Sequence, residues 1–270
     1  MLTRYNKYLA LLKETTGIVT TFLVFFSCTE RVWDNPNDPG SDNYNGGQNN
    51  ALQFGSVADI DGNTYKTIKI GTQTWMAENL RYLPSVSPYN IPFTDSVPSY
   101  HIFGYVGDNI QEAKDYIYNG QNIYKTSGVL YNFAAAMTAC PTGWHCPTKS
   151  DWIKLNEFIR TNNSLGESYE FTVTLGFTTL NWPGVSPYLR SGGFFNGNNK
   201  YGFSAVPTGF IKRYNDDTFG GIYDREAYFW SATRNEDNSI GHLVLNSLEE
   251  SMYSLNNNNI NAFAVRCIKD

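Results

Sequence analysis

The clearest structural signal in the sequence is the start of an amphipathic helix at Thr148. Residues 140–160 read CPTGWHCPTKSDWIKLNEFIR. Thr148 can cap a helix through its hydroxyl, and Asp151 three residues later completes a capping box with Asp in place of the usual Glu. Four apolar side chains then share one helical face, namely Trp152, Leu155, Phe158 and Ile159. The segment predicts a helix that packs its apolar face on a sheet.

Strand signals lie on both sides of this helix. Residues 58–63 (ADIDGN) contain an Asp-Gly turn of the kind that closes a hairpin, and residues 64–70 and 74–77 favour two short antiparallel strands. A second helix is predicted over residues 132–138, where helix-favouring residues predominate. Further strands are predicted at residues 201–206, 210–214, 228–233, 241–246, 251–255 and 262–268. A few helices with many short strands predict one α+β domain.

Residues 83–124 have no clear period and scatter prolines among tyrosines. We expect a long irregular loop or an inserted hairpin there, and long loops are often functional. Aromatic residues make up 16% of the chain. Tyrosine suits half-buried strands as well as wet binding surfaces, and the first role is the simpler explanation of this content.

The N-terminus has the pattern of an export signal. Residues 1–13 carry three basic side chains, and residues 17–26 (GIVTTFLVFF) form an apolar run. That run is too short to cross a bilayer as a helix, which needs about 20 residues. It is followed by Ser27 and Cys28, which resemble the lipobox of bacterial lipoproteins and imply acylation of Cys28 and cleavage before it. The alternative is an N-terminal helix of the fold with an ordinary cysteine.

Residues 29–50 are dominated by Asn, Asp, Gly and Pro and cannot bury enough apolar surface to offset the entropy of ordering. The sequence therefore predicts a signal peptide at 1–27, a lipidated Cys28 with a disordered tether at 28–50, and one domain at 51–270. We expect the acyl anchor to hold the protein in the outer membrane, on its periplasmic or cell-surface side.

The charge of the chain argues against nucleic acid as a partner. The whole chain has 20 basic and 25 acidic side chains, a net charge of −5. Removing the signal takes away three basic and one acidic side chain, which leaves 17 and 24 and a net charge of −7. No basic run or stripe remains in the mature part.

Several short motifs occur in order from residue 57 to the C-terminus. They are DGNTY (61–65), TWMAENLR (74–81), GVLYN (128–132), CPTGWH (140–145), PT (147–148) with Trp152, YFWSA (228–232) and VRC (265–267). This order resembles the Fibrobacter succinogenes major paralogous domain family, found in exported, often lipid-anchored proteins of Fibrobacter and Bacteroidetes-type bacteria. The resemblance implies a C-type-lectin-like single domain, similar to formylglycine-generating enzymes, with two main helices packed on short, mostly antiparallel strands.

The resemblance also implies a disulfide between Cys140 and Cys267. With Cys28 lipidated, three cysteines remain in an oxidising compartment. A bridge that closes a loop of about a hundred residues contributes up to about 4.7 kcal/mol in the chain-entropy account, whereas the alternative bridge from Cys140 to Cys146 closes little chain. We expect Cys146 to be a small buried apolar residue.

Candidates for chemistry are few, and we predict no catalytic residue, no bound metal and no cofactor apart from a possible structural calcium ion. His101, His145 and His242 lack the spacing of zinc ligands, so a structural hydrogen-bonding role is expected for His145. The YFWSA strand lacks the carboxylate and amide that lectins of this fold use to bind calcium.

The candidate ligand site combines acidic and aromatic residues of one predicted loop. It comprises Tyr214, Asp216, Asp217, Phe219, Tyr223 and Asp224. Exposed aromatic rings beside polar loops can stack on sugars or contact a protein. Calcium binding is one interpretation of the acidic side chains, and a solvated surface is the simpler one.

The sequence thus predicts a non-catalytic binding or adhesion domain at the cell envelope, which contacts a polysaccharide or an envelope protein through residues 83–124 and 211–227. One alternative is an enzyme related to the formylglycine-generating group, which needs a reactive thiol at Cys146 or Cys267. The other is a purely structural envelope protein.

Overall fold

The computed structural model describes residues 52–88, 94, 96–172, 178–212, 219–220, 223–235, 239–257 and 261–270. The predicted export signal, Cys28 and the tether lie outside the described residues. Within them the chain forms seventeen strands, five α-helices and one 3₁₀ helix, η1 (Gly193–Phe195). This is an α+β fold made mostly of strands, as predicted. None of these helices is long and apolar enough to cross a bilayer.

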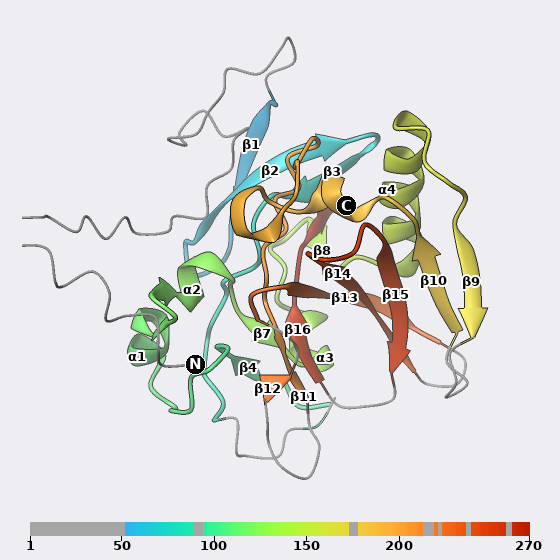
Figure 1. The fold of residues 1–270 in the computed structure, drawn as a ribbon. Coiled ribbons are helices and arrows are strands. Elements are labelled where there is room, and N and C mark those ends of the chain that lie inside the picture. The colour runs from blue at the N-terminus through green and yellow to red at the C-terminus, as the bar shows by residue number, and fades with distance from the viewer. Residues whose placement is uncertain are drawn as a thin grey trace, which may run out of the picture. The chain divides into compact units, whose positions relative to one another are not determined.

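The smaller main sheet pairs the first strands of the described domain with its last one. Its strands are β1 (Phe54–Ala58), β2 (Thr64–Ile70), β3 (Gln73–Met76), β8 (Trp144–His145) and β17 (Ile268–Lys269). Their order is β1-β2-β3-β17-β8, and each pair is antiparallel. The C-terminus therefore lies beside β3 and β8 (Figure 1). The predicted Asp-Gly hairpin is confirmed as β1–β2, and the two predicted strands after it are β2 and β3.

The larger sheet is built mainly from the second half of the chain. Its strands are β4 (Tyr100–His101), β7 (Leu130–Tyr131), β9 (Tyr169–Thr172), β10 (Thr178–Trp182), β11 (Phe210–Lys212), β12 (Phe219–Gly220), β13 (Glu226–Arg234), β14 (Ile240–Asn246), β15 (Met252–Asn257) and β16 (Asn261–Ala264). Their order is β12-β11-β16-β13-β14-β15-β10-β9, with β7 beside β16 and β4 beside β7. Among these described strands only β13 and β16 pair in parallel, so the expected antiparallel character is confirmed.

The long helix begins where the sequence predicts. Helix α4 (Lys149–Asn162) is capped by Thr148, whose hydroxyl accepts a hydrogen bond from the backbone N–H of Asp151 at 3.2 Å. The Asp151 carboxylate in turn accepts from the backbone N–H of Thr148 at 2.9 Å. Burial opposes the charge on Asp151, but the hydrogen bonds from Thr148 and His145 outweigh it and hold the pKa of the carboxyl below its usual range. The capping box is confirmed.

Helix α4 packs between the two sheets through Trp152. The Trp152 ring centroid lies 4.8 Å from that of Trp75 in β3 and 6.0 Å from that of Phe229 in β13. Its indole N–H donates to the backbone carbonyl of Trp230 at 3.2 Å. Because these rings are fully or almost fully buried, they form the centre of one core shared by the helix and both sheets.

The remaining helices are short, and one of them, with the start of a second, lies in the segment predicted to be a loop or hairpin. They are α1 (Ile110–Asp115), α2 (Ile123–Thr126), α3 (Phe133–Ala136) and α5 (Ser186–Leu189). Between α1 and α2 lies a small hairpin of β5 (Ile117–Tyr118) and β6 (Gln121–Asn122). An inserted hairpin was one of the two predictions for residues 83–124.

Three expectations about the elements are wrong in whole or in part. The single strand expected at residues 262–268 is interrupted at residues 265–267, and its two ends, β16 and β17, belong to different sheets. The second main helix, expected over residues 132–138, is only the four-residue α3, so α4 is the single helix longer than six residues in the described part. The strand expected at residues 201–206 does not form. Gly202 and Ser204 have φ values of 72° and 56°, which a strand cannot accommodate, and the Ser204 N–H donates to the side chain of Asn199 instead of to a neighbouring strand.

A buried arginine, Arg266, lies where the chain passes from β16 in the larger sheet to β17 in the smaller one. The Arg266 side chain donates to the side-chain oxygen of Asn79 and to the backbone carbonyls of Phe203 and Met76. Its guanidinium lies 4.6 Å from the centroid of the Phe203 ring. Burial lowers the pKa of Arg266 to about 9, opposed by the nearby charge of Glu78, so the side chain stays charged at neutral pH.

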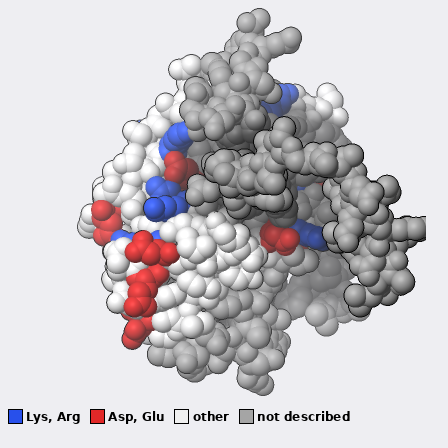
Figure 2. All heavy atoms as spheres, turned by 60° about the vertical axis from the view of Figure 1, so that its left-hand side comes forward, with Lys and Arg blue, Asp and Glu red and all other residues white. Residues whose placement is uncertain are grey.

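Charged side chains are dispersed over the face of the domain shown in Figure 2. Its described Lys and Arg side chains form small groups among acidic and uncharged residues rather than one continuous stripe. The expectation that the protein does not bind nucleic acid stays a prediction.

Candidate functional site

The two segments predicted to contact a partner meet in the structure through Tyr223. Its ring stacks on Phe103 with centroids 4.7 Å apart, and its hydroxyl shares a 2.7 Å hydrogen bond with the hydroxyl of Ser127. Tyr223 is only 8% exposed. The prediction of an exposed aromatic ring at Tyr223 is therefore wrong. The ring packs inside the domain and the hydroxyl forms a hydrogen bond there, and both contacts hold the two segments together.

The other predicted ligand residues are described only in part. Tyr214, Asp216 and Asp217 lie outside the described residues, and so does the side chain of Phe219, whose backbone belongs to β12. Asp224 is half-buried in the turn after Tyr223. Within the described ranges, no three His, Cys, Asp or Glu side chains are arranged to hold a metal ion.

The cysteines form the pair that the resemblance implies. Cys140 and Cys267 are joined by a disulfide with their Cα atoms 5.9 Å apart. Cys146 is a free thiol, 3% exposed, and its burial raises the pKa of the thiol well above the usual range. It packs in the hydrophobic core, as expected. Neither Cys146 nor Cys267 therefore offers an accessible thiolate.

His145 has the structural role expected from the sequence. Its Nδ1 lies 2.6 Å from a carboxylate oxygen of Asp270, and its Nε2 lies 3.3 Å from one of Asp151. The ring thus bridges the last residue of the chain and the first turn of α4. Because both nitrogens face carboxylates that belong to the fold, this arrangement is a structural tie between the terminus and the helix.

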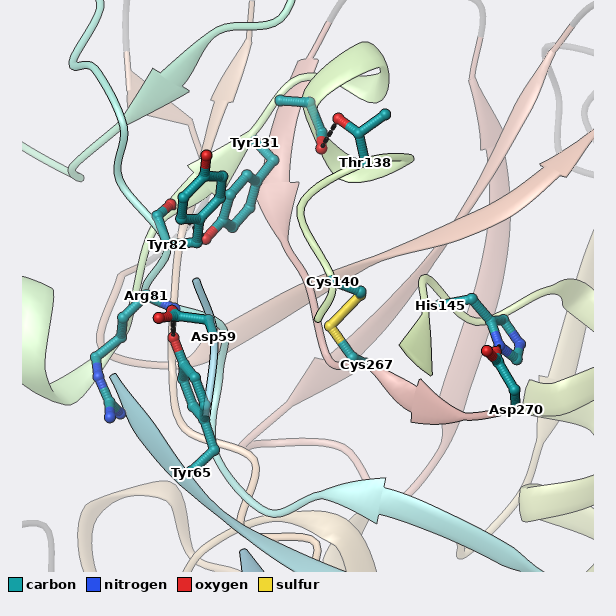
Figure 3. Close-up of a disulfide and its surroundings, with 11 residues drawn as sticks. Asp59, Tyr65, Arg81, Tyr82, Tyr131, Thr138, Cys140, His145, Cys267 and Asp270 are labelled. Carbon is teal, nitrogen blue, oxygen red and sulfur yellow. Dashed lines mark hydrogen bonds and ion pairs between the residues drawn. A yellow bond between two sulfur atoms is a disulfide. The ribbon is translucent and has the colours of Figure 1, made fainter. Parts of the chain in front are cut away.

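A groove that the sequence does not indicate lies beside the disulfide (Figure 3). Its volume is about 460 Å³, and its walls are residues 57–60, Tyr82 and residues 138–142. The first wall is the end of edge strand β1 and the turn after it, and the last is the segment that leads from α3 to Pro141. These three parts of the chain are far apart in sequence, which is why no motif predicts the groove.

The turn at the groove wall is fixed by Asp59. One carboxylate oxygen accepts from the backbone N–H groups of Asp61 and Asn63, at 3.0 and 2.9 Å. The other accepts from the Asn63 amide at 2.8 Å and from the Tyr65 hydroxyl at 2.5 Å. Burial and the bond to Asp59 raise the pKa of Tyr65, so its phenol remains a neutral donor. The DGNTY motif is therefore a structural turn.

Tyr82 is held in place on a second wall of the groove. Its backbone carbonyl accepts the Tyr131 hydroxyl at 2.9 Å, and its ring packs edge-on against Tyr100 with centroids 6.1 Å apart. No hydrogen bond to its own hydroxyl is formed by the described residues. On the opposite wall, the Thr138 hydroxyl donates to the carbonyl of Ala135 at 3.4 Å, and the hydroxyl of exposed Thr142 has no partner in the described part.

Comparison with known proteins identifies the family. A family model described as the Fibrobacter succinogenes major domain matches residues 68–269, from within β2 to the end of β17. The comparisons with curated proteins and with solved structures gave no match. The matched range covers three quarters of the chain and includes the capping box, both disulfide cysteines and the buried arginine. The chain therefore belongs to the Fibrobacter succinogenes major domain family.

Proposed function

We propose that this protein is a lipid-anchored protein of the cell envelope whose domain binds a glycan or a protein partner without catalysing a reaction. The observation that carries the proposal is the state of the cysteines. The enzymatic alternative requires a reactive thiol at Cys146 or Cys267. Cys267 is oxidised in the disulfide, and Cys146 is buried with a raised thiol pKa. Both features favour a binding role over the thiol chemistry of the formylglycine-generating group.

A C-type-lectin-like architecture is part of this proposal. Its support is the capped helix α4, which begins nine residues after Cys140, and the closing segment 265–267, which the disulfide ties to Cys140. The pairing of β17 with β3 brings both ends of the domain together. Such an arrangement leaves the intervening loops to vary and to carry a binding site.

The location belongs to the proposal as well. The basic head, the short apolar run and Cys28 are the support for an acyl anchor in the outer membrane, with the domain on the periplasmic or cell-surface side. The polar composition of residues 29–50 suits a tether between the anchor and the domain.

Binding to an array of bacterial and plant polysaccharides, with and without calcium, tests this role. The protein is the mature chain carrying Cys28→Ser, so that no lipid is attached. We expect binding to at least one glycan, or capture of one envelope protein in a parallel cross-linking experiment. A dependence on calcium would implicate the acidic residues Asp216, Asp217 and Asp224. Turnover of any tested substrate that is abolished by Cys146→Ala would contradict the proposal.

A further inference from the structure

We propose that the groove beside the disulfide binds a neutral sugar unit of a polysaccharide, placed against the ring of Tyr82. This inference rests on the binding role proposed above and gives that role a site and a ligand class. None of the described residues that line the groove belongs to residues 211–227, where the sequence suggested a ligand site. It is built from residues 57–60, Tyr82 and residues 138–142.

The size of the groove suits a small part of a polymer. Ligand pockets in proteins commonly have volumes of about 300–1,000 Å³. At about 460 Å³ the groove is near the lower end of that range, and it is open to solvent. An open groove of this size can accept one or two rings of a chain that continues beyond it on either side.

The charge of the groove favours a neutral ligand. Among the described residues that line it, Asp59 is the only charged one. Both of its carboxylate oxygens already accept two hydrogen bonds each from Asp61, Asn63 and Tyr65. A cationic ligand thus finds no free acceptor on Asp59. An anionic ligand meets a buried negative charge, and no basic residue of the described lining offsets it.

The uncharged groups of the groove match the chemistry of a sugar. Tyr82 provides an aromatic ring with an unused hydroxyl at its edge, as far as the described residues show, and such a ring can contact the apolar face of a pyranose. Thr138 and Thr142 provide hydroxyls in the wall formed by residues 138–142, and Figure 3 shows Thr138 above the disulfide and Tyr82 to its upper left. Hydroxyl-bearing ligands can both donate to and accept from groups of this kind.

The walls are held in place before any ligand arrives. The disulfide fixes Cys140 within the 138–142 wall, and the N–H of Trp144 donates to the carbonyl of Pro141 at 2.9 Å. The carboxylate of Asp59 fixes the opposing turn. Rigid walls lose little conformational freedom on binding, which favours a measurable affinity from few contacts.

The test uses the mature chain with Cys28→Ser and isothermal titration calorimetry. The probes are soluble oligosaccharides from a glucan, a xylan and a mannan, with an oligogalacturonide as the anionic comparison. We expect a neutral oligosaccharide to bind, to bind equally in EDTA, and to outcompete the anionic one. Tyr82→Ala should weaken binding about tenfold or more, through loss of the aromatic contact. Tyr82→Phe keeps the aromatic ring and should weaken binding of the oligosaccharide less than Tyr82→Ala does.

A second variant keeps the test decisive if Tyr82→Ala does not fold. Ala58 is exposed at the groove, so Ala58→Trp fills the groove without removing a core contact and should block binding. Tyr169→Ala is the matched control, because it removes an exposed tyrosine that does not line the groove. It should bind as the parent chain does. Thermal unfolding of each variant shows that the comparison is made between folded proteins.

The outcomes separate this inference from the proposed function. A sugar that binds Tyr82→Ala and Ala58→Trp as tightly as the parent chain overturns the groove inference, while the binding role stands. Failure of every neutral oligosaccharide to bind also overturns it, and capture of an envelope protein then decides the binding role independently. The chain could also bind the anionic probe more tightly than the neutral ones and lose that binding in Ala58→Trp. This result would place a ligand in the groove but would overturn the inference that the ligand is a neutral sugar.

Discussion

Arg266 shows how a charged side chain can be accommodated in the core of the domain. Its guanidinium carries a full charge into the core without a carboxylate in hydrogen-bond contact, and is satisfied by backbone carbonyls, by Asn79 and by the face of Phe203. Five fixed donors in one plane make this possible, whereas an ammonium has three donors on a flexible stem. The family motifs ENLR and VRC therefore meet in one buried cluster, since they contain Asn79 and Arg266.

We predict that Arg266→Lys lowers the free energy of unfolding by about 3 kcal/mol, because a lysine keeps the buried charge but leaves acceptors unsatisfied. Urea unfolding followed by tryptophan fluorescence measures the change. Arg225→Lys is the control at an exposed arginine and should change stability by no more than about 0.5 kcal/mol. A similar loss in both variants would contradict a special role of Arg266.

Two buried histidines make stability depend on pH. Burial lowers the pKa of His101 to about 4, opposed by its bond to Ser87, and lowers that of His242 to about 3. Above the unfolded value of 6.5 both states hold these rings neutral. Below it the unfolded chain takes up protons that the folded chain refuses, so the free energy of unfolding falls as the pH drops from 6.5 towards 4.

His242→Phe should reduce this pH dependence. The Nδ1 of His242 is buried and has no hydrogen-bond partner among the described residues. The His242 ring stacks on Phe263 with ring centroids 4.5 Å apart, so a phenylalanine can replace it without loss of a hydrogen bond from Nδ1. We expect the slope of unfolding free energy against pH between 6 and 4 to fall by about 1.4 kcal/mol per pH unit. Urea titrations at three pH values measure it. An unchanged slope would show that His242 already titrates in the folded chain.

At the scale of elements, helix α4 and strand β17 are joined through the segment that carries Cys140. The disulfide links positions 127 residues apart, and β17 pairs with both β3 and β8. Linking such distant positions restricts the unfolded chain strongly, because the loop that the bond closes is long. The same bond fixes one wall of the groove.

Replacing Cys140 and Cys267 together by alanine should lower the free energy of unfolding by about 5 kcal/mol in the chain-entropy account. The measurement is the difference between the urea midpoints of the parent chain and the double variant, converted with the m-value. Cys146→Ala tests the pairing: its own midpoint should still shift on reduction with dithiothreitol. If reduction has no effect in Cys146→Ala, the bond involves Cys146 after all.

For the whole molecule, the prediction concerns Cys28, which lies outside the described residues. Expressed in a bacterium that processes lipoproteins, the full chain should incorporate a labelled fatty acid and fractionate with the outer membrane. Cys28→Ala should lose both properties, because a thioether needs the thiol. Cys146→Ala, with its thiol buried in the folded domain, should keep both. Label retained in Cys28→Ala would exclude this residue as the anchor.

The sequence alone determines the local features of this protein and its family. The capping box at Thr148, the Asp-Gly hairpin, the β2 and β3 strands and the predominance of strands all follow from residues within a few positions of one another. Local hydrogen bonds and side-chain periodicity determine such features, so these features can be predicted from the sequence without knowledge of the tertiary structure. The pairing of Cys140 with Cys267 was implied by the resemblance to the family and favoured by the entropy of closing a long loop.

The tertiary structure decided what depends on distant residues. The burial of Tyr223 against Phe103 and the acceptors of Arg266 both involve partners far along the chain. The groove likewise joins β1, Tyr82 and the segment after α3. A sequence pattern reports whether a side chain is apolar or polar, but only packing determines which surfaces close against each other and which remain open.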